Sequence, residues 1–243
     1  MTAAVARGML RAMRFAPLSA LFAAVVLSSC SLFRSAPAER DYTLVYLKTG
    51  PAVGLSKDEQ AQVFAGHFAN MNRLAREGHL VMAGPFGKQR SDTALRGIFV
   101  LATGDVARAK ELAQSDPGVK SGVFALEYHS LRTAAPLAQF LAAELAREDA
   151  DKAAGKTPKP SDNIRGYALL IADDYAKMAE ALDGRREALL VGAMDERAGF
   201  AIVNCIDRTA AEEAFARLRE QLGTHRFEEW FASKGLVQLP TME

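Results

Sequence analysis

The sequence predicts an α+β protein made of two consecutive units, each with its elements in the order β-α-β-β-α-β. Short runs rich in β-branched and aromatic residues alternate along the chain with longer runs of helical periodicity. After a segment rich in Lys, Ala, Pro and Asp at residues 150–163, the same order of runs starts again. The length of 243 residues also suits two small domains better than one.

Composition and charge narrow the classes of function. Hydrophobic residues make up 49% of the chain and charged residues 24%, which is ordinary for a globular protein with a sizeable core. The formal net charge is only +1, so the chain has no strong excess of basic residues for binding nucleic acid. We therefore expect no nucleic-acid partner.

The N-terminal residues are predicted to be a targeting signal. Three arginines between residues 7 and 14 precede a mainly apolar run at residues 15–27, which is too short to span about 30 Å of hydrocarbon as a helix. The tetrad Leu-Ser-Ser-Cys that ends at Cys30 resembles the lipobox of bacterial lipoproteins, in which cleavage precedes the cysteine and its sulfur is lipidated. An ordinary signal peptide with an incidental cysteine is the alternative.

The lipobox implies a location for the protein. Residues 1–29 are then a lipoprotein signal peptide, Cys30 carries the acyl chains (palmitate among them), and residues 30–40 are a tether. Each buried methylene group adds roughly 0.8 kcal/mol of membrane affinity, so several chains hold a protein firmly to a membrane. Ser31 follows the cysteine, which favours the outer membrane by analogy with enteric bacteria. We expect a lipid-anchored protein of the bacterial cell envelope that faces the periplasm. Cys205 is then left without a disulfide partner.

The first unit is predicted at residues 41–132. Ser56 and Glu59 have the spacing of a capping box, so a helix begins after Ser56, and Gly78 supplies its stop. The strands are expected at residues 42–47, 79–83, 95–102 and within 123–131, and the helices at residues 57–77 and 106–114. Because the first strand is apolar on both faces, both faces of the sheet need cover.

The second unit is predicted at residues 164–243, after a helical connector and flexible linker at residues 133–163. Its strands are expected at residues 166–172, 187–194, 199–206 and within 231–239, and its helices at residues 174–185 and 209–222. Short matches between the units, FANM with YAKM and LVMAGP with LLVGAM, support a shortened, degenerate copy of the same order.

Two stretches carry a family resemblance. They are HFANMNRLAREGHLVMAGP, from His67 to Pro85, and DPGVKSGVFALEYH, from Asp116 to His129. In residue sequence and spacing they resemble the YCII-related (YciI-like) family of small ferredoxin-like proteins, which usually dimerise sheet against sheet into an α+β barrel. The resemblance implies that this chain contains tandem ferredoxin-like units packed as an intramolecular α+β barrel, with the second unit as the built-in partner.

The same resemblance implies a site at His67 and Asp116. A carboxylate next to an imidazole fixes its tautomer, which suits general acid or base catalysis near neutral pH. The plain alternatives are a histidine packed at a helix edge and an aspartate that forms a turn before Pro-Gly. Gly84 and Pro85 are weaker candidates for ligand binding, and a purely conformational role is favoured for them. We expect no metal and no cofactor, since the sequence has no metal-ligand spacing and no nucleotide-binding motif.

Two functional hypotheses remain open. In the first, the protein is an envelope lipoprotein that binds a small ligand in a pocket near the His-Asp pair, without turnover. In the second, it is a low-specificity lyase, isomerase or dehalogenase with His67 as general acid or base and Asp116 as the group that orients it. The pair is not repeated in the second unit, where Asp174 is matched approximately to His67. Whether the protein forms a homodimer also stays open.

Overall fold

The computed structural model describes residues 38–157 and 159–242. The predicted signal peptide at residues 1–29, Cys30 and most of the tether lie outside these residues. Within the described residues, no helix combines the length and the apolar character that crossing a membrane requires.

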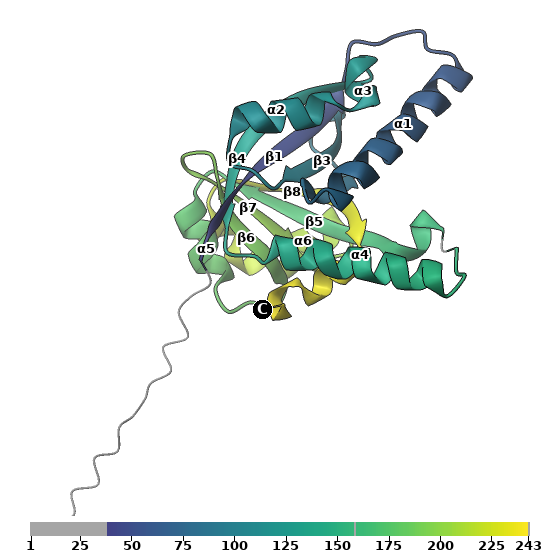
Figure 1. Cartoon of the computed structure of the whole chain (residues 1–243). Coiled ribbons are helices and arrows are strands. Elements are labelled where there is room, and N and C mark those ends of the chain that lie inside the picture. Colours follow the sequence, from purple (N-terminus) through teal and green to yellow (C-terminus); the bar gives the residue numbers. More distant parts are fainter. Residues whose placement is uncertain (1–37, 158, 243) are drawn as a thin grey trace, which may run out of the picture. The chain divides into compact units, whose positions relative to one another are not determined.

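Eight strands and seven α-helices make up most of the described chain, and Figure 1 shows how they are arranged. The strands are β1 (Arg40–Thr49), β2 (Leu80–Pro85), β3 (Leu95–Leu101), β4 (Phe124–Thr133), β5 (Ile164–Ala172), β6 (Ala188–Met194), β7 (Ala198–Val203) and β8 (His225–Ser233). The α-helices are α1 (Lys57–Arg76), α2 (Val106–Gln114), α3 (Pro117–Lys120), α4 (Leu137–Ala153), α5 (Tyr175–Leu182), α6 (Arg208–Ala214) and α7 (Arg219–Leu222). Three 3₁₀ segments, η1 (Pro160–Asn163), η2 (Ala216–Leu218) and η3 (Lys234–Thr241), complete the order.

All strands belong to one antiparallel sheet with the order β2-β3-β1-β4-β6-β7-β5-β8. The short pairing of β4 with β6 joins its two halves. At the outer edges, β2 and β8 approach each other through a bridge between Phe86 and Trp230 and a bond from the Gly87 N–H to the Glu229 carbonyl at 2.8 Å. The fold is therefore a mixed α/β fold with a nearly closed, barrel-like sheet, in which few backbone groups are left at a free edge.

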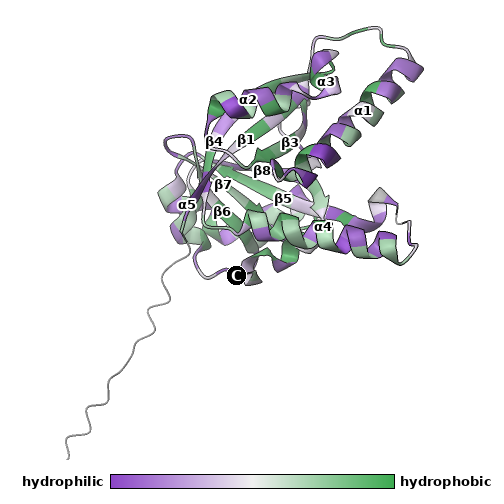
Figure 2. Ribbon diagram, viewed as in Figure 1, coloured by the Kyte–Doolittle hydropathy of each residue, from purple (hydrophilic) through white to green (hydrophobic). Residues whose placement is uncertain are grey.

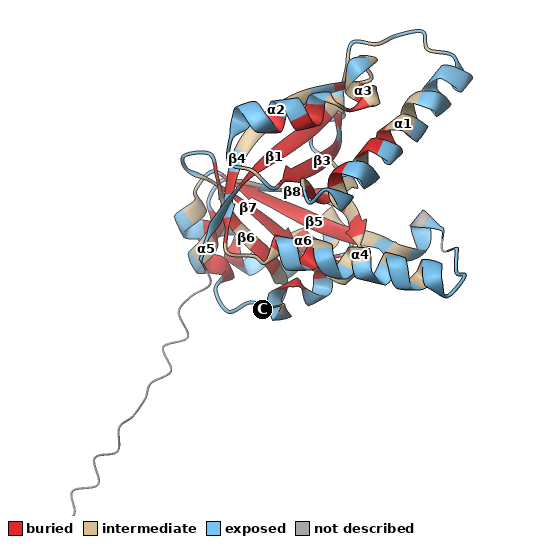
Figure 3. Ribbon diagram, viewed as in Figure 1, coloured by how far each residue is buried: buried red, intermediate tan, exposed pale blue. Residues whose placement is uncertain are grey.

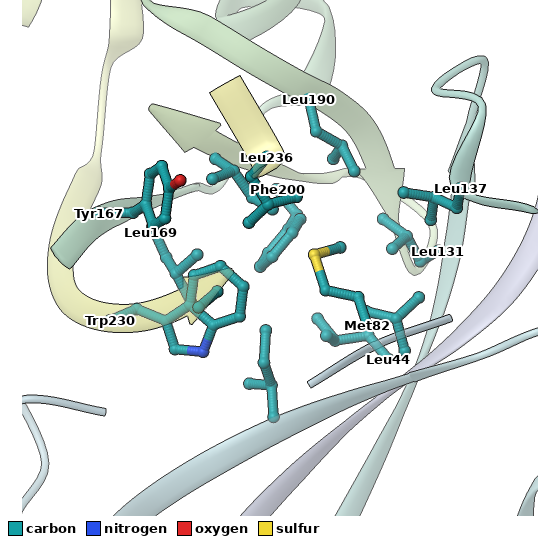
Figure 4. Close-up of a cluster of buried hydrophobic side chains, with 14 of the residues drawn as sticks. Leu44, Met82, Leu131, Leu137, Tyr167, Leu169, Leu190, Phe200, Trp230 and Leu236 are labelled. Atoms are coloured by element: carbon teal, nitrogen blue, oxygen red, sulfur yellow. The ribbon is translucent and has the colours of Figure 1, made fainter. Parts of the chain in front are cut away.

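Both faces of the sheet are buried, as the apolar pattern predicts (Figures 2 and 3). In β1, Leu44 and Tyr46 face an inner core, whereas Val45 and Leu47 face a core on the helix side. Strand residues from both halves meet in the inner core, among them Met82 and Trp230 (Figure 4). Separate apolar clusters lie on the helix side of each half. The inner core is thus shared between the halves, and burying it requires both.

Most predicted elements are confirmed, but the last strand is placed wrongly by the sequence. The expected strand within residues 231–239 is mainly the 3₁₀ segment η3, and the strand is β8, which begins at His225. Charged residues at the start of β8 conceal it, because Glu228 is buried and compensated by bonds from Ser91 and Arg226. In η3, the Ser233 hydroxyl accepts a bond from the Gly235 N–H, and the turn that follows buries two leucines in the inner core.

Other boundaries also differ from the prediction. The expected helix at residues 209–222 is divided into α6, η2 and α7. This division lets Phe215, Leu218 and Leu222 all pack into the core on the helix side. The expected strand at residues 199–206 ends at Val203, and α4 includes the first residues of the predicted linker.

Candidate functional site

The first component of the site is one face of α1. Ser56 and Glu59 form the predicted capping box, in which each side chain accepts a bond from the backbone N–H of the other residue. The buried residues of the helix are His67, Asn70 and Leu74, which are spaced so that they lie on one side. His67 is therefore held against the sheet by the same periodicity that forms the helix.

The second component is the turn between α2 and α3. Asp116 precedes α3, and its Oδ1 accepts a bond from the Gly118 N–H at 2.7 Å, with Pro117 at the first helical position. The whole residue is fully buried, at 0% exposure. The turn-forming role that the sequence suggests for Asp116 is thus present, but it uses only one of the two carboxylate oxygens.

The other oxygen meets His67. The Nδ1 atom of His67 lies 2.8 Å from Oδ2 of Asp116, although the two residues are 49 positions apart. Because an ionised carboxylate only accepts hydrogen bonds, Nδ1 carries the proton and Nε2 is the nitrogen left for other partners. Gly66 permits this approach, since a Cβ there would lie 3.0 Å from Cγ of Pro117. The structure therefore brings together the two residues that the resemblance paired.

Asn70 extends the pair into a network that the sequence reasoning missed. Its Oδ1 accepts bonds from Arg73 at 2.9 Å and from the Ser115 hydroxyl at 3.0 Å, which turns its Nδ2 toward Oδ2 of Asp116 at 3.5 Å. His67, Asn70 and Arg73 are spaced three residues apart on α1, a regularity that was available in the sequence. The network holds the buried carboxylate in place from two sides.

Aromatic rings surround the imidazole. The ring of Phe99 stacks on that of His67 with centroids 5.8 Å apart, and the ring of Phe124 lies tilted at 5.1 Å. Phe64 and Phe68 approach it from α1 itself. His67 is only 7% exposed, so its hydrogen bond to Asp116 lies in a largely apolar environment.

A cavity of about 380 Å³ lies beside the imidazole. It is lined by Leu47, Phe64, His67, Phe68, Met71, Gly84, Pro85, Phe86, Arg90, Leu95, Arg96, Gly97, Ile98, Phe99 and Phe124. Its volume falls in the range of about 300–1,000 Å³ that is usual for small-molecule sites. The structure thus brings His67, Gly84 and Pro85 to one cavity, and Asp116 lies behind His67 with no exposed surface.

Gly84 has a further, conformational reason to be glycine. A Cβ at this position would overlap the carbonyl oxygen of Phe231 and come within 2.9 Å of the Trp230 ring. This close approach lets β2 meet β8 at the nearly closed edge of the sheet. The conformational role favoured by the sequence is therefore present, and the residue also contributes to the cavity wall.

The residue matched approximately to His67 in the second half has another role. Asp174 caps α5 by accepting a bond from the Lys177 N–H at 3.1 Å, and so it lies at the start of a helix rather than within one.

Cys205 is buried, and burial raises the pKa of its thiol, which makes it a poor nucleophile. Within residues 38–157 and 159–242, no group of three or more His, Cys, Asp or Glu side chains is arranged to hold a metal ion.

A comparison with protein-family models bears on the half that contains this network and cavity. Residues 42–132 match the family model of the YCII-related domain. The match supports the resemblance noted in the sequence, and it includes His67, Asp116 and the residues around the cavity. The YCII-related region covers less than half of the chain, and the function of the family is uncertain. A search of curated proteins finds no match for the chain.

Proposed function

We propose that the YCII-related region binds a small molecule in the cavity next to His67. The observation that carries this proposal is the position of the imidazole, which forms part of the cavity wall while its Nδ1 is bound to a fully buried carboxylate. Four phenylalanines around the ring supply apolar surface for the ligand, and Nε2 supplies a directional polar contact. The cavity therefore combines an apolar body with one oriented polar group.

Crystals of the protein soaked with a fragment library test this proposal. Bound fragments are expected in the cavity, in contact with His67. The variant Met71→Trp, which places a large ring in the cavity wall, should lose these fragments, whereas Val237→Trp on the surface should keep them. Fragments that collect elsewhere, or that bind equally to Met71→Trp, would count against the cavity as the binding site.

The second candidate function is acid-base catalysis. The contact of 2.8 Å between His67 and Asp116 favours it, because a buried carboxylate that orients an imidazole is the arrangement that a general base needs. In this candidate Nε2 removes a proton from the substrate or returns one to it, as in a lyase, isomerase or dehalogenase reaction. Turnover of an identified substrate should fall about 10²–10⁴-fold in His67→Gln. If His67→Gln retains full turnover, the protein uses another group or only binds.

We also infer that the described chain consists of two ferredoxin-like units, the second a degenerate copy that closes an intramolecular barrel. The order β2-β3-β1-β4 of the first half has the same form as β6-β7-β5-β8 of the second, which supports this inference. A protease site inserted at Lys156 tests it. After cleavage the two halves should stay together in native buffer, because they share the inner core, and separate only in denaturant. Since the second half covers the inner face of the first, a homodimer would need a different surface.

For the N-terminal residues we propose a lipid anchor at Cys30, which would hold the protein at the outer membrane on the periplasmic side. The support is the arginine-rich start, the short apolar run and the small-residue tetrad before the cysteine. Labelling with a clickable fatty acid is expected for the wild type and for Cys205→Ala, but not for Cys30→Ala. Equal labelling of all three proteins would rule out the lipid anchor at Cys30.

A further inference from the structure

The charged side chains of the cavity wall are positive. Arg90 and Arg96 line the cavity together with His67, and no aspartate or glutamate is among the lining residues. Within the described residues, neither arginine forms an ion pair with a carboxylate, although several other arginines do so. A guanidinium group in a largely apolar wall without a carboxylate partner favours an anionic ligand.

The loop that carries Arg90 is fixed by two glutamates from β8. The Gln89 N–H donates to Glu229 at 2.9 Å and the Ser91 N–H donates to Glu228 at 2.6 Å. These bonds hold the backbone on both sides of Arg90. The two carboxylates therefore hold the backbone beside Arg90 without forming an ion pair with its guanidinium group, and the ligand site is preorganised.

Arg90 itself retains an unused donor. One terminal nitrogen, Nη1, donates to the Gly87 carbonyl, while Nε is buried and meets no acceptor among the described residues. Buried donors are nearly always paired in folded proteins, so an unpaired one in the wall of a cavity points to a bound acceptor. A carboxylate can accept bonds from Nε and a terminal nitrogen of the same guanidinium group.

The other residues of the cavity wall indicate the chemistry of the other end of the ligand. The phenylalanine rings around His67 favour a flat, apolar body, and the unpaired Nε of Arg90 with a terminal nitrogen offers one edge that matches the two oxygens of a carboxylate. Arg96 is exposed to solvent, so it is placed to assist at the mouth of the cavity rather than to hold a second charge inside it. We propose that the cavity binds a small organic acid, with its carboxylate on Arg90, assisted by Arg96, and an aromatic or apolar body beside His67. This inference rests on the proposed small-molecule function of the same cavity.

Matched acids and amides test the inference on the whole protein. The probes are acetate, benzoate and phenylacetate, each paired with its neutral amide, and the readouts are dissociation constants from calorimetry and the shift of the His67 ring resonances. At least one acid is expected to bind about tenfold or more tightly than its amide. Arg90→Met should remove most of this preference. Lys88→Met, which removes an exposed positive charge from the same loop outside the cavity wall, should keep it.

The outcomes separate the two proposals. If acids and amides both shift His67 with equal affinity, the organic-acid inference is wrong and the small-molecule function stands. If no acid and no amide shifts His67, both are wrong. Should Arg90→Met fail to fold, the comparison of acid with amide on the wild type decides alone, since it needs no variant.

Discussion

The two halves of the described chain have strands in equivalent order, but they differ in how their first helix meets the sheet. In the second half, α5 is 8 residues long and Met178 is fully buried against Gly199, where a Cβ would lie 2.5 Å from the methionine methyl carbon. In the first half, α1 is 20 residues long and Met71, which occupies the same place in the FANM and YAKM matches, is only partly buried and lines the cavity. Met178 thus fills space against the sheet in the second half, whereas Met71 borders the cavity in the first half.

This difference explains where function is expected. A filled helix face contributes stability through burial of apolar side chains, whereas a hollow face loses that contribution and can hold a ligand. The buried Asp116 and its partners belong to the hollow half, whereas Asp174, the residue matched approximately to His67, only caps a helix. The second half supplies its side of the inner core, and the first half carries the candidate chemistry.

The largest expected effect concerns the inner core that joins the halves. Trp230, the only tryptophan of the chain, is fully buried where β8 meets the end of β2. Trp230→Ala should lower the free energy of unfolding by about 3–5 kcal/mol, because it removes a large side chain from a core shared by both halves. Urea unfolding followed by circular dichroism measures this, with the exposed Ile206→Ala as control. A loss below about 1 kcal/mol would mean that the halves do not depend on this contact.

The contrast between a filled and a hollow helix face can be tested directly. Met178→Ala should cost about 2–5 kcal/mol of unfolding free energy, since it leaves a cavity in a close-packed cluster. Met71→Ala should cost about 1 kcal/mol or less, because that side chain already borders empty volume. Parallel urea titrations of the two variants give the comparison. Equal losses would show that the two helix faces are packed alike.

Asp116 in the first half and the helix-capping Asp174 in the second half should respond differently to the same substitution. Asp116→Asn should cost about 1–3 kcal/mol, because the buried oxygen that accepts from His67 and Asn70 is replaced or turned. It should also move the imidazole proton from Nδ1 to Nε2, which ¹⁵N chemical shifts detect. Asp174→Asn should change stability by less than about 0.5 kcal/mol, since asparagine caps a helix equally well. An unchanged His67 tautomer in Asp116→Asn would contradict the assigned role of the carboxylate.

The smallest effect concerns alkaline pH and Tyr167, whose hydroxyl donates to the Ser233 carbonyl at 2.8 Å. Burial raises the pKa of Tyr167 to about 12 from the ordinary value of 10.0. Its contribution to stability is therefore complete below pH 10, where both states are protonated, and is lost as the pH rises through 12, because the unfolded chain ionises first. Between about pH 9 and 11, the wild type should lose about 1 kcal/mol more stability than Tyr167→Phe. Parallel losses in the two proteins over this range would contradict the raised pKa.

Local patterns in the sequence determined most of the secondary structure. The capping box at Ser56 and Glu59 and the periodicity of α1 depend on neighbours a few residues away, so they can be read without the fold. The doubly apolar strands likewise predicted a sheet buried on both faces. The pairing of His67 with Asp116 followed from the resemblance to the YCII-related family, which relates residues that local pattern cannot connect.

Only the tertiary structure decided the features that depend on contacts between distant segments. The strand β8 was hidden because the burial of Glu228 is compensated by Ser91, which is 137 residues away, and sequence pattern treats such a glutamate as exposed. Asn70 and Arg90 were missed for the same reason: the first acquires its role from Ser115 and Asp116, and the second lies in a loop whose backbone N–H groups donate to carboxylates of β8. The sequence specifies which side chains are available. The geometry of a site, however, depends on contacts between elements that are far apart in the chain, and local periodicity does not predict such contacts.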